Sequence, residues 1–330
     1  MRNILLIILL FFSLAVPAQS YHFSQFYSAP LFINPALTGY IDGPYRIAGN
    51  IRSQWGTGGS PFTTVALSAD AVLLKKHIQE GNTLGAGICV LNDKTLGGAV
   101  KSSTIGVSTA YNIVLDQDNI HTIGLGFQGI YNERRIDFSS LSFENQFGGS
   151  GFDPSLPIGE SLPAGKTNYF DINVGSVYHM TLTDKSFFAG IGAYNVIRHK
   201  DNIQANEFRM PRRFTFIAGG QADVGYDGIF YFSMNYQEQS AAKELTVGAA
   251  YGIQVGLDKI QVINFGLWHR VKDAIIPYVG YQRDGFQAGF SFDYTISNLK
   301  TSSQVRNGFE LSMIFTANDK SEIKKLLPWF

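Results

Sequence analysis

The residue types that most often carry catalysis or bind metals are few in this sequence and widely separated. Its six histidines lie in different segments, and none has a second histidine, a cysteine or a glutamate at the spacing of a metal site. Cys89 is the single cysteine, so neither an internal disulfide nor a cysteine-based metal cluster can form. We therefore expect no metal ion and no cofactor, and we interpret as isolated polar residues His22, His77, His121, His179, His199 and His269.

Three further patterns could suggest chemistry, and each lacks a necessary part. A barrel phospholipase would need a serine–histidine pair with an orienting third group, and no serine motif accompanies His121 or His269. The acidic, glycine-rich stretch 143–159 lacks the alternating ligand order of a calcium loop. No helix follows Gly124 and Gly126 to bind a phosphate, so these glycines leave room beside a strand. We therefore predict no catalytic residues and no enzyme activity.

The elements that position these side chains are predicted to be long strands. Residues alternate with period two over 243–255, 286–297 and 104–115, with one apolar, aromatic face and one face rich in Gly, Ser, Asn and Gln. A soluble sandwich with one wet face and a membrane barrel with a polar lumen both have this pattern. Strands of roughly 10 to 14 residues, an uncharged polar face and aromatic residues near the strand ends favour the barrel.

The number and spacing of these segments agree with a bacterial barrel. Alternate connections are tight, whereas the other set includes the long loops 93–99, 133–167 and 198–211, as expected when long loops face the outside of the cell. We predict an all-β fold, a 14-stranded antiparallel transmembrane β-barrel with an N-terminal plug segment, over 45–317. The predicted strands are 45–56, 62–74, 82–92, 100–115, 119–132, 168–181, 186–197, 212–224, 228–239, 243–255, 260–270, 274–283, 285–298 and 305–317.

The two ends of the chain carry separate signals. Arg2 and the apolar run 4–16 predict a signal peptide over 1–18. The aromatic segment 19–44 is predicted to be a plug or a periplasmic segment, because a lumen of this width needs filling. The tail 318–330 is expected in the periplasm. The last strand ends on a short pattern that resembles the signal for barrel assembly, carried by Gly308, Leu311 and Met313.

The longest predicted loop is more apolar than a solvated loop needs to be. Aromatic side chains on a loop stiffened by prolines are typical of a binding hot spot. A loop that folds inward as a lid over the lumen is the alternative. The candidate partner-binding residues are Phe143, Phe147, Phe152 and Pro154.

Charges balance over the chain, with 26 Lys and Arg against 26 Asp and Glu, so no net field attracts nucleic acid. Ten charges fall on the lumen-facing parity of the predicted strands. They could form a selective pore, or pair with one another and hold the plug. Pairing is favoured because unpaired charges near a low dielectric are costly. The ten are Arg46, Arg52, Asp70, Asp171, Asp223, Glu244, Arg270, Asp293, Arg306 and Glu310.

Four phrases near the start of the chain are distinctive: F-S-Q-F-Y at 23–27, a proline at 30, N-P-A at 34–36 and R-S-Q-W at 52–55. They resemble the opening of the PorP/SprF family of type IX secretion system outer-membrane proteins. Later phrases extend the resemblance over about 21 to 315, while the tail beyond departs from the family pattern. The plug motif consists of Phe23, Gln25, Phe26, Tyr27, Asn34 and Pro35.

This resemblance implies a non-enzymatic outer-membrane barrel of the secretion and gliding motility apparatus of Bacteroidetes. The implied partners are a secreted type IX substrate with a type B C-terminal sorting domain, other periplasmic or lipoprotein secretion components, and outer-membrane lipid. Both a role in the secretion machinery itself and a role as the dedicated partner of one adhesin or enzyme stay open. The alternative is a FadL-like transporter of hydrophobic solutes, which also combines fourteen strands with an N-terminal plug.

Overall fold

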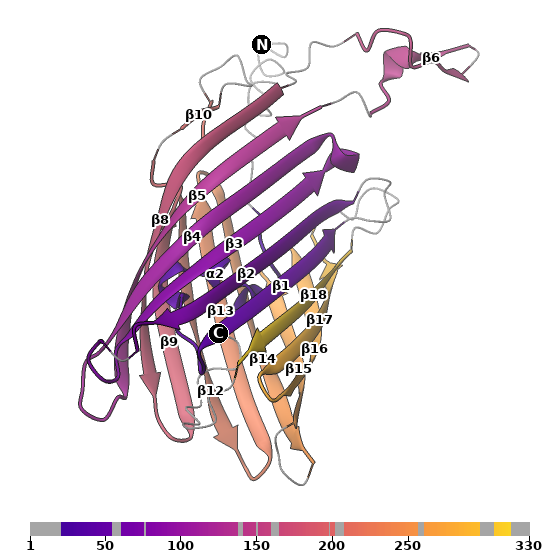
Figure 1. Ribbon diagram of the computed structural model, residues 1–330. Coiled ribbons are helices and arrows are strands. Elements are labelled where there is room, and N and C mark those ends of the chain that lie inside the picture. Colours follow the sequence, from indigo (N-terminus) through magenta and orange to yellow (C-terminus); the bar gives the residue numbers. More distant parts are fainter. Residues whose placement is uncertain are drawn as a thin grey trace, which may run out of the picture.

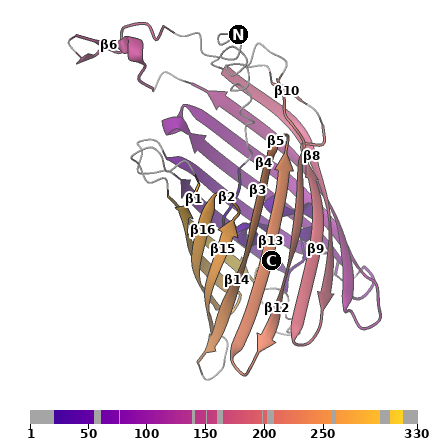
Figure 2. The same ribbon diagram turned by 180° about the vertical axis from the view of Figure 1, so that it is seen from behind.

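The computed structural model describes residues 21–54, 61–75, 77–137, 141–149, 151–159, 165–197, 199–201, 208–256, 261–297 and 307–317. Its main feature is a closed barrel of antiparallel strands, seen from opposite sides in Figures 1 and 2. Within the described residues, no helix is long and apolar enough to cross a membrane.

Each barrel strand pairs with its neighbours along the chain, and the last strand pairs with the first. At this closure Ile51 lies opposite Leu311 and Gly49 lies opposite Met313. The prediction of a 14-stranded antiparallel barrel is therefore confirmed. The strands are β1 (Tyr45–Gln54), β2 (Phe62–Leu73), β3 (Thr83–Thr95), β4 (Val100–Val114), β5 (His121–Ile136), β8 (Gly165–Thr181), β9 (Lys185–Tyr194), β12 (Arg213–Val224), β13 (Gly228–Gln239), β14 (Ala242–Val255), β15 (Gln261–Arg270), β16 (Ala274–Arg283), β17 (Phe286–Thr295) and β18 (Gly308–Thr316).

The barrel has an apolar outer wall and a polar inner wall. In β1, Ile47 and Ile51 point outward and are about half exposed, while Arg46, Asn50 and Arg52 at alternate positions are buried. The same alternation repeats around the barrel, and exposed aromatic and aliphatic side chains cover its outside. A soluble protein would hide this surface, so the arrangement is the one expected where the outer wall contacts hydrocarbon.

The connections at the two ends of the barrel differ in length. At one end, here named the turn end, short turns join the strands, for example at 182–184 and 225–227. The opposite end, here named the loop end, carries the long connections 137–164 and 195–212. The first includes the helical turn η6 (Glu144–Gln146) and strands β6 (Phe147–Gly148) and β7 (Gly151–Phe152), and the second includes β10 (Lys200–Asp201) and β11 (Phe208–Arg209).

Several strands extend further at the loop end than the sequence pattern predicts. β5 continues to Ile136 and β8 begins at Gly165, so the boundaries predicted for the loop at 133–167 are wrong. The apolar alternation ends before the backbone ladder does, because polar pairs continue it: Lys166 Nζ lies 2.8 Å from Glu133. β3 likewise runs to Thr95, and the helical turn η4 (Leu96–Gly98) replaces most of the loop predicted at 93–99.

A closed barrel leaves no unpaired edge strand from which the sheet can unravel. We therefore expect the protein to leave membranes only with detergent and to migrate faster on gels when unheated than after boiling. Gel mobility of purified protein with and without heating measures this. Solubility in buffer without detergent would contradict the membrane barrel.

Candidate functional site

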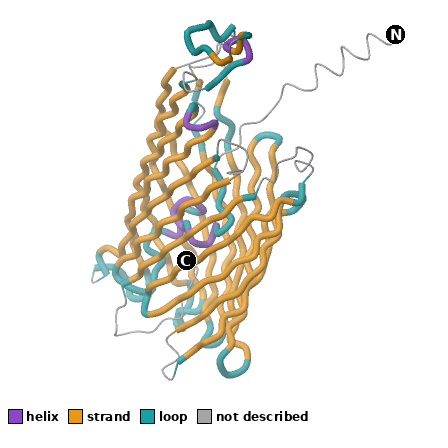
Figure 3. The backbone as a smooth tube through the Cα atoms, turned by 90° about the vertical axis from the view of Figure 1, so that its right-hand side faces the viewer, coloured by secondary structure: helices purple, strands orange, loops and turns teal. Residues whose placement is uncertain are grey.

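The interior of the barrel holds the N-terminal segment, defined as residues 21–44 (Figure 3). It folds into three short helical turns, η1 (Phe26–Ser28), α2 (Pro30–Ile33) and η2 (Pro35–Leu37). Proline stands at the first position of the last two, where its missing N–H costs no hydrogen bond. The side chain of Asn34 caps η2 by accepting from the backbone N–H of Ala36 at 2.9 Å.

Apolar side chains of this segment pack against the inner wall as in a protein core. Phe26 and Tyr27 are fully buried. The centroid of the Tyr27 ring lies 5.0 Å from the ring centroid of Trp268 and 5.8 Å from that of Tyr278. A second cluster joins Phe23, Leu31 and Phe32 of the segment to Ala66, Cys89 and Leu91 of the wall.

Glycines in the wall let the backbone of the segment approach closely. A Cβ at Gly126 would collide with Pro35 and Ala36, and one at Gly175 would collide with Asn34. A Cβ at Gly85 would likewise collide with the backbone of Thr38. These strand glycines therefore shape the inner wall to one chain segment, in line with the room that the sequence pattern assigns to them.

Ion pairs and hydrogen bonds fix the segment at the loop end of the barrel. Asp293 of β17 pairs with Arg52 at 2.8 Å and with Arg270 at 2.9 Å, and it accepts from the Ser24 hydroxyl at 2.7 Å. Glu310 of β18 accepts from the backbone N–H groups of Ser24 at 2.7 Å and Gln25 at 3.3 Å. Four strands, β1, β15, β17 and β18, thus share one network with the segment.

A second ion pair holds the other end of the segment near the turn end. Arg46 of β1 lies 2.9 Å from Asp70 of β2 and donates to the Leu37 carbonyl at 3.0 Å. Asp70 in turn accepts from the Gly39 N–H at 2.7 Å. The segment therefore runs along the barrel, with Ser24 near the loop end and Gly39 near the turn end.

Six of the ten lumen-facing charges predicted from parity pair with one another, whereas Glu310 binds backbone N–H groups and Asp171 lies beside a histidine. Asp171 lies 3.4 Å from His199, and Glu244 lies 3.9 Å from Arg270. Asp223 shares the inward parity of Arg213, Thr215 and Ile217 in β12 but is exposed at the end of the strand. Arg306 lies outside the described residues.

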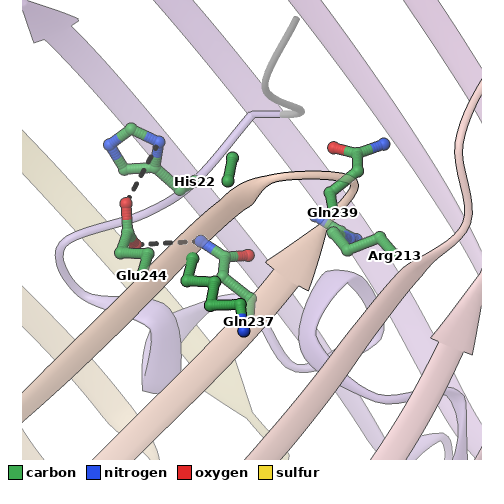
Figure 4. A pocket seen from close by; sticks show the side chains of 7 residues that line it. His22, Arg213, Gln237, Gln239 and Glu244 are labelled. Carbon is green, nitrogen blue, oxygen red and sulfur yellow. Dashed lines mark hydrogen bonds and ion pairs between the residues drawn. The ribbon is translucent and has the colours of Figure 1, made fainter. Parts of the chain in front are cut away.

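A small pocket opens beside the start of the segment at the loop end (Figure 4). Its lining residues are His22, Arg213, Gln237, Gln239, Ala242, Lys243 and Glu244. Gln237 donates to Glu244 at 2.9 Å, and His22 Nδ1 lies 3.8 Å from the same carboxylate. Burial and the nearby guanidinium groups of Arg52 and Arg270 hold the pKa of His22 well below its usual value, so the ring is neutral at pH 7.

The predicted partner-binding residues lie on a projecting hairpin (Figure 1). Phe147 of β6 and Phe152 of β7 are 60% and 46% exposed, and their ring centroids are 5.2 Å apart. Pro154 is exposed and Phe143 is half-buried. The side chain of Gln146 bridges the hairpin by accepting from the Phe143 N–H at 3.1 Å and donating to the Leu156 carbonyl at 3.2 Å.

The residues of the predicted assembly signal lie on the closing strand. Leu311 and Met313 of β18 point outward, and Gly308 begins the strand opposite Gln54. Their role in assembly stays a prediction. Among the described residues, no cluster of three or more His, Cys, Asp or Glu side chains is placed to hold a metal ion.

Comparison with known families decides the identity. The model of the type IX secretion system membrane protein PorP/SprF matches residues 15–315. The chain belongs to this family. The resemblance seen in the sequence is thereby confirmed, and the fold and the family together make this PorP/SprF protein an outer-membrane β-barrel of the type IX secretion system.

Solved structures with the same fold are remote in sequence. The toluene transporter TbuX of Ralstonia pickettii is 11% identical, with 87% of this chain and 92% of that chain covered and a TM-score of 0.52. A FadL homologue of Pseudomonas aeruginosa is 11% identical over 87% and 94%, with a TM-score of 0.54. The toluene transporter TodX of Pseudomonas putida is 8% identical over 89% and 93%, with a TM-score of 0.53. At such identities the likeness shows the fold alone. Comparison with curated protein sequences finds no match.

Sequence reasoning missed two features of this PorP/SprF protein. It did not indicate the direction in which the N-terminal segment runs, because no local pattern specifies partners such as Ser24 and Asp293, 269 positions apart. It also passed over Arg213, although this residue shares the inward parity of Thr215 and Ile217 in β12 and so carried the same signal as the lumen charges.

The buried Cys89 offers a direct reporter on the N-terminal segment. Its side chain is 2% exposed and belongs to the same buried cluster as Leu31 and Phe32 of the segment. We expect Glu310→Gln to speed maleimide labelling of Cys89 by about 10- to 100-fold, because weaker hydrogen bonds to the segment let it leave the wall more often. A hydrogen bond to a charged group is worth roughly 1.5–3 kcal/mol, and about 1.4 kcal/mol changes an equilibrium constant tenfold.

The matched control is Glu238→Gln, since Glu238 bonds the Tyr236 hydroxyl and Lys243 away from the segment. Labelling rates in purified, detergent-solubilised protein are compared by mass spectrometry. Equal rates for both variants would show that Glu310 does not hold the segment in place.

Proposed function

We propose that this PorP/SprF protein is a closed docking barrel, in which the N-terminal segment plugs the lumen and the loop end holds a secreted partner at the cell surface. The observation that carries this proposal is the contrast between the interior of the barrel and the hairpin at its loop end. The N-terminal segment packs in the interior, where Arg46, Arg52 and Arg270 are paired with carboxylates, whereas aromatic side chains stand exposed on the projecting hairpin.

The proposal places the loop end outside the cell and the turn end in the periplasm. Short turns on one side and long loops on the other are the usual asymmetry of outer-membrane barrels. The signal peptide 1–18 and the periplasmic tail 318–330 belong to this proposal and lie outside the described residues. Export of the chain through the inner membrane and insertion from the periplasm require this orientation.

The proposed partner is a secreted type IX substrate with a C-terminal sorting domain, and contacts to other secretion components would lie at the turn end. A pair of aromatic rings held on a bridged hairpin loses little conformational entropy on binding. Such rings are the usual anchors of a protein interface. Gliding motility would follow where the secreted partner is an adhesin.

Transport of hydrophobic solutes is the second candidate, because the fold resembles that of two toluene transporters. An apolar solute would have to pass the ion pairs of Arg52 and Arg270 with Asp293, together with the N-terminal segment that binds them. Moving an apolar solute past polar, paired groups is energetically unfavourable, so the interior favours docking over solute transport.

Deleting Tyr21 to Gly39 tests the plug. We expect the barrel to insert and to remain heat-modifiable but to admit antibiotics, because the deletion removes buried side chains worth about 1.5–3 kcal/mol each as an upper estimate and empties the lumen. Antibiotic sensitivity of whole cells measures leakage. Removing the hairpin 143–156 is the control that should leave the barrel tight. Unchanged permeability after the first deletion would contradict a plug.

Changing Phe143, Phe147 and Phe152 together to serine tests docking. We expect the secreted partner to be lost from protein purified out of native outer membranes, with no gain in antibiotic leakage, because the hairpin stands clear of the barrel. Tyr226→Ser, which removes an 86% exposed aromatic ring at the turn end, is the matched control. A retained partner with a leaky barrel would instead show that the loop is a lid.

A further inference from the structure

One buried arginine inside the barrel differs from the others in its partners. Arg46, Arg52 and Arg270 each pair with a carboxylate. Arg213, at the loop end of β12, is 5% exposed, and no carboxylate of the described residues lies within ion-pair distance. Its Nη1 donates to the Tyr21 carbonyl at 3.4 Å, while its buried Nε has no hydrogen-bond partner.

Two aromatic rings hold the guanidinium of Arg213 in place. Its central carbon lies 4.2 Å from the Tyr194 ring centroid and 5.2 Å from that of Tyr21. Such cation–π contacts offset part of the cost of burying the charge but provide no hydrogen-bond acceptor. A guanidinium held between two rings, with its Nε lacking an acceptor and Nη1 making one long hydrogen bond, suits the planar, two-oxygen geometry of a carboxylate.

The surroundings of Arg213 suit an incoming acid. Figure 4 shows Arg213 and Gln239 on one side of the pocket and His22, Gln237 and Glu244 on the other. Lys243 at the rim is paired with Glu238 at 3.6 Å, so Arg213 is the basic group of the lining without a carboxylate partner among the described residues. The one carboxylate of the lining, that of Glu244, is occupied by Gln237 and by Arg270 at 3.9 Å.

We infer that this pocket binds a carboxylate of the secreted polypeptide, either its terminal group or an acidic side chain. The inference rests on the proposed function, because only an outward-facing loop end meets such a partner. The pocket is too small for more than one such group, and it lies at the same end of the barrel as the hairpin. Partner contact would then combine aromatic anchors on the hairpin with a charged contact at the mouth.

The test uses the full-length protein in detergent and a fluorescent hexapeptide, Gly-Asp-Glu-Gly-Asp-Glu, with an amidated Gly-Asn-Gln-Gly-Asn-Gln peptide as the neutral probe. Fluorescence anisotropy should show binding of the acidic peptide only. Arg213→Met should weaken that binding by about tenfold or more, since a bidentate charged contact is lost. Arg213→Lys should bind more tightly than Arg213→Met, because lysine keeps the positive charge but lacks the paired N–H donors of the guanidinium.

The matched control is Arg212→Met, which removes the same charge from the exposed neighbour whose Nε donates to the Val196 carbonyl. Equal weakening by both variants would reduce the effect to general charge and overturn the inference. So would absence of binding, or equal binding of both peptides, which are read on the unaltered protein and do not depend on folding of a variant. Displacement of the peptide by free acetate at low millimolar concentration would assign the pocket to small acids.

The outcome is separate from that of the docking proposal. If the serine variant of the hairpin loses the partner while the acidic peptide binds without Arg213, this inference alone fails. If the peptide requires Arg213 but the hairpin variant keeps its partner, docking through the hairpin fails and the carboxylate site stands.

Discussion

Compensation of buried charge is the constraint on which the interior of this barrel depends. Asp293 alone compensates part of the charge of two arginines from different strands. It also accepts a hydrogen bond from Ser24 of the N-terminal segment. Removing one member of such a group leaves the others buried without compensation, which costs more than the pair contributes. The segment is therefore bound into the wall rather than loosely enclosed by it.

Most of the fold follows from the alternation of residue types, because a membrane strand must present one face to lipid and the other to the interior. This constraint places strands such as β14 and β16 within one residue of their observed bounds. It ceases to act where a strand rises out of the membrane. The polar extensions of β5 and β8, with Glu133 opposite Asn168 and Arg135 opposite Lys166, are held by backbone pairing that leaves no periodic apolar signal.

The candidate site was predictable in its membership but not in its connections. Apolar content identifies Phe23, Phe26 and Tyr27 as buried, and parity identifies Arg52 and Asp293 as inward-facing. Pairing depends on tilt and register around a closed wall, so it needs the whole barrel. Parity places Asp223 on the inward face but does not indicate that it is exposed at the strand end. Arg213 is an inward charge whose importance emerges only from its neighbours, which are aromatic rings rather than carboxylates.

A shared fold does not decide between transport and docking, since function resides in the site that a fold carries. What distinguishes this chain is how its interior is used. Glycines such as Gly126 and Gly175 remove side chains from the wall at the places where the N-terminal segment passes, so the wall is shaped to a polypeptide. An interior fitted to its own backbone, with charges that bind that backbone, is the feature on which the docking proposal rests. The uncompensated Arg213 lies at the loop end, where the fitted interior stops.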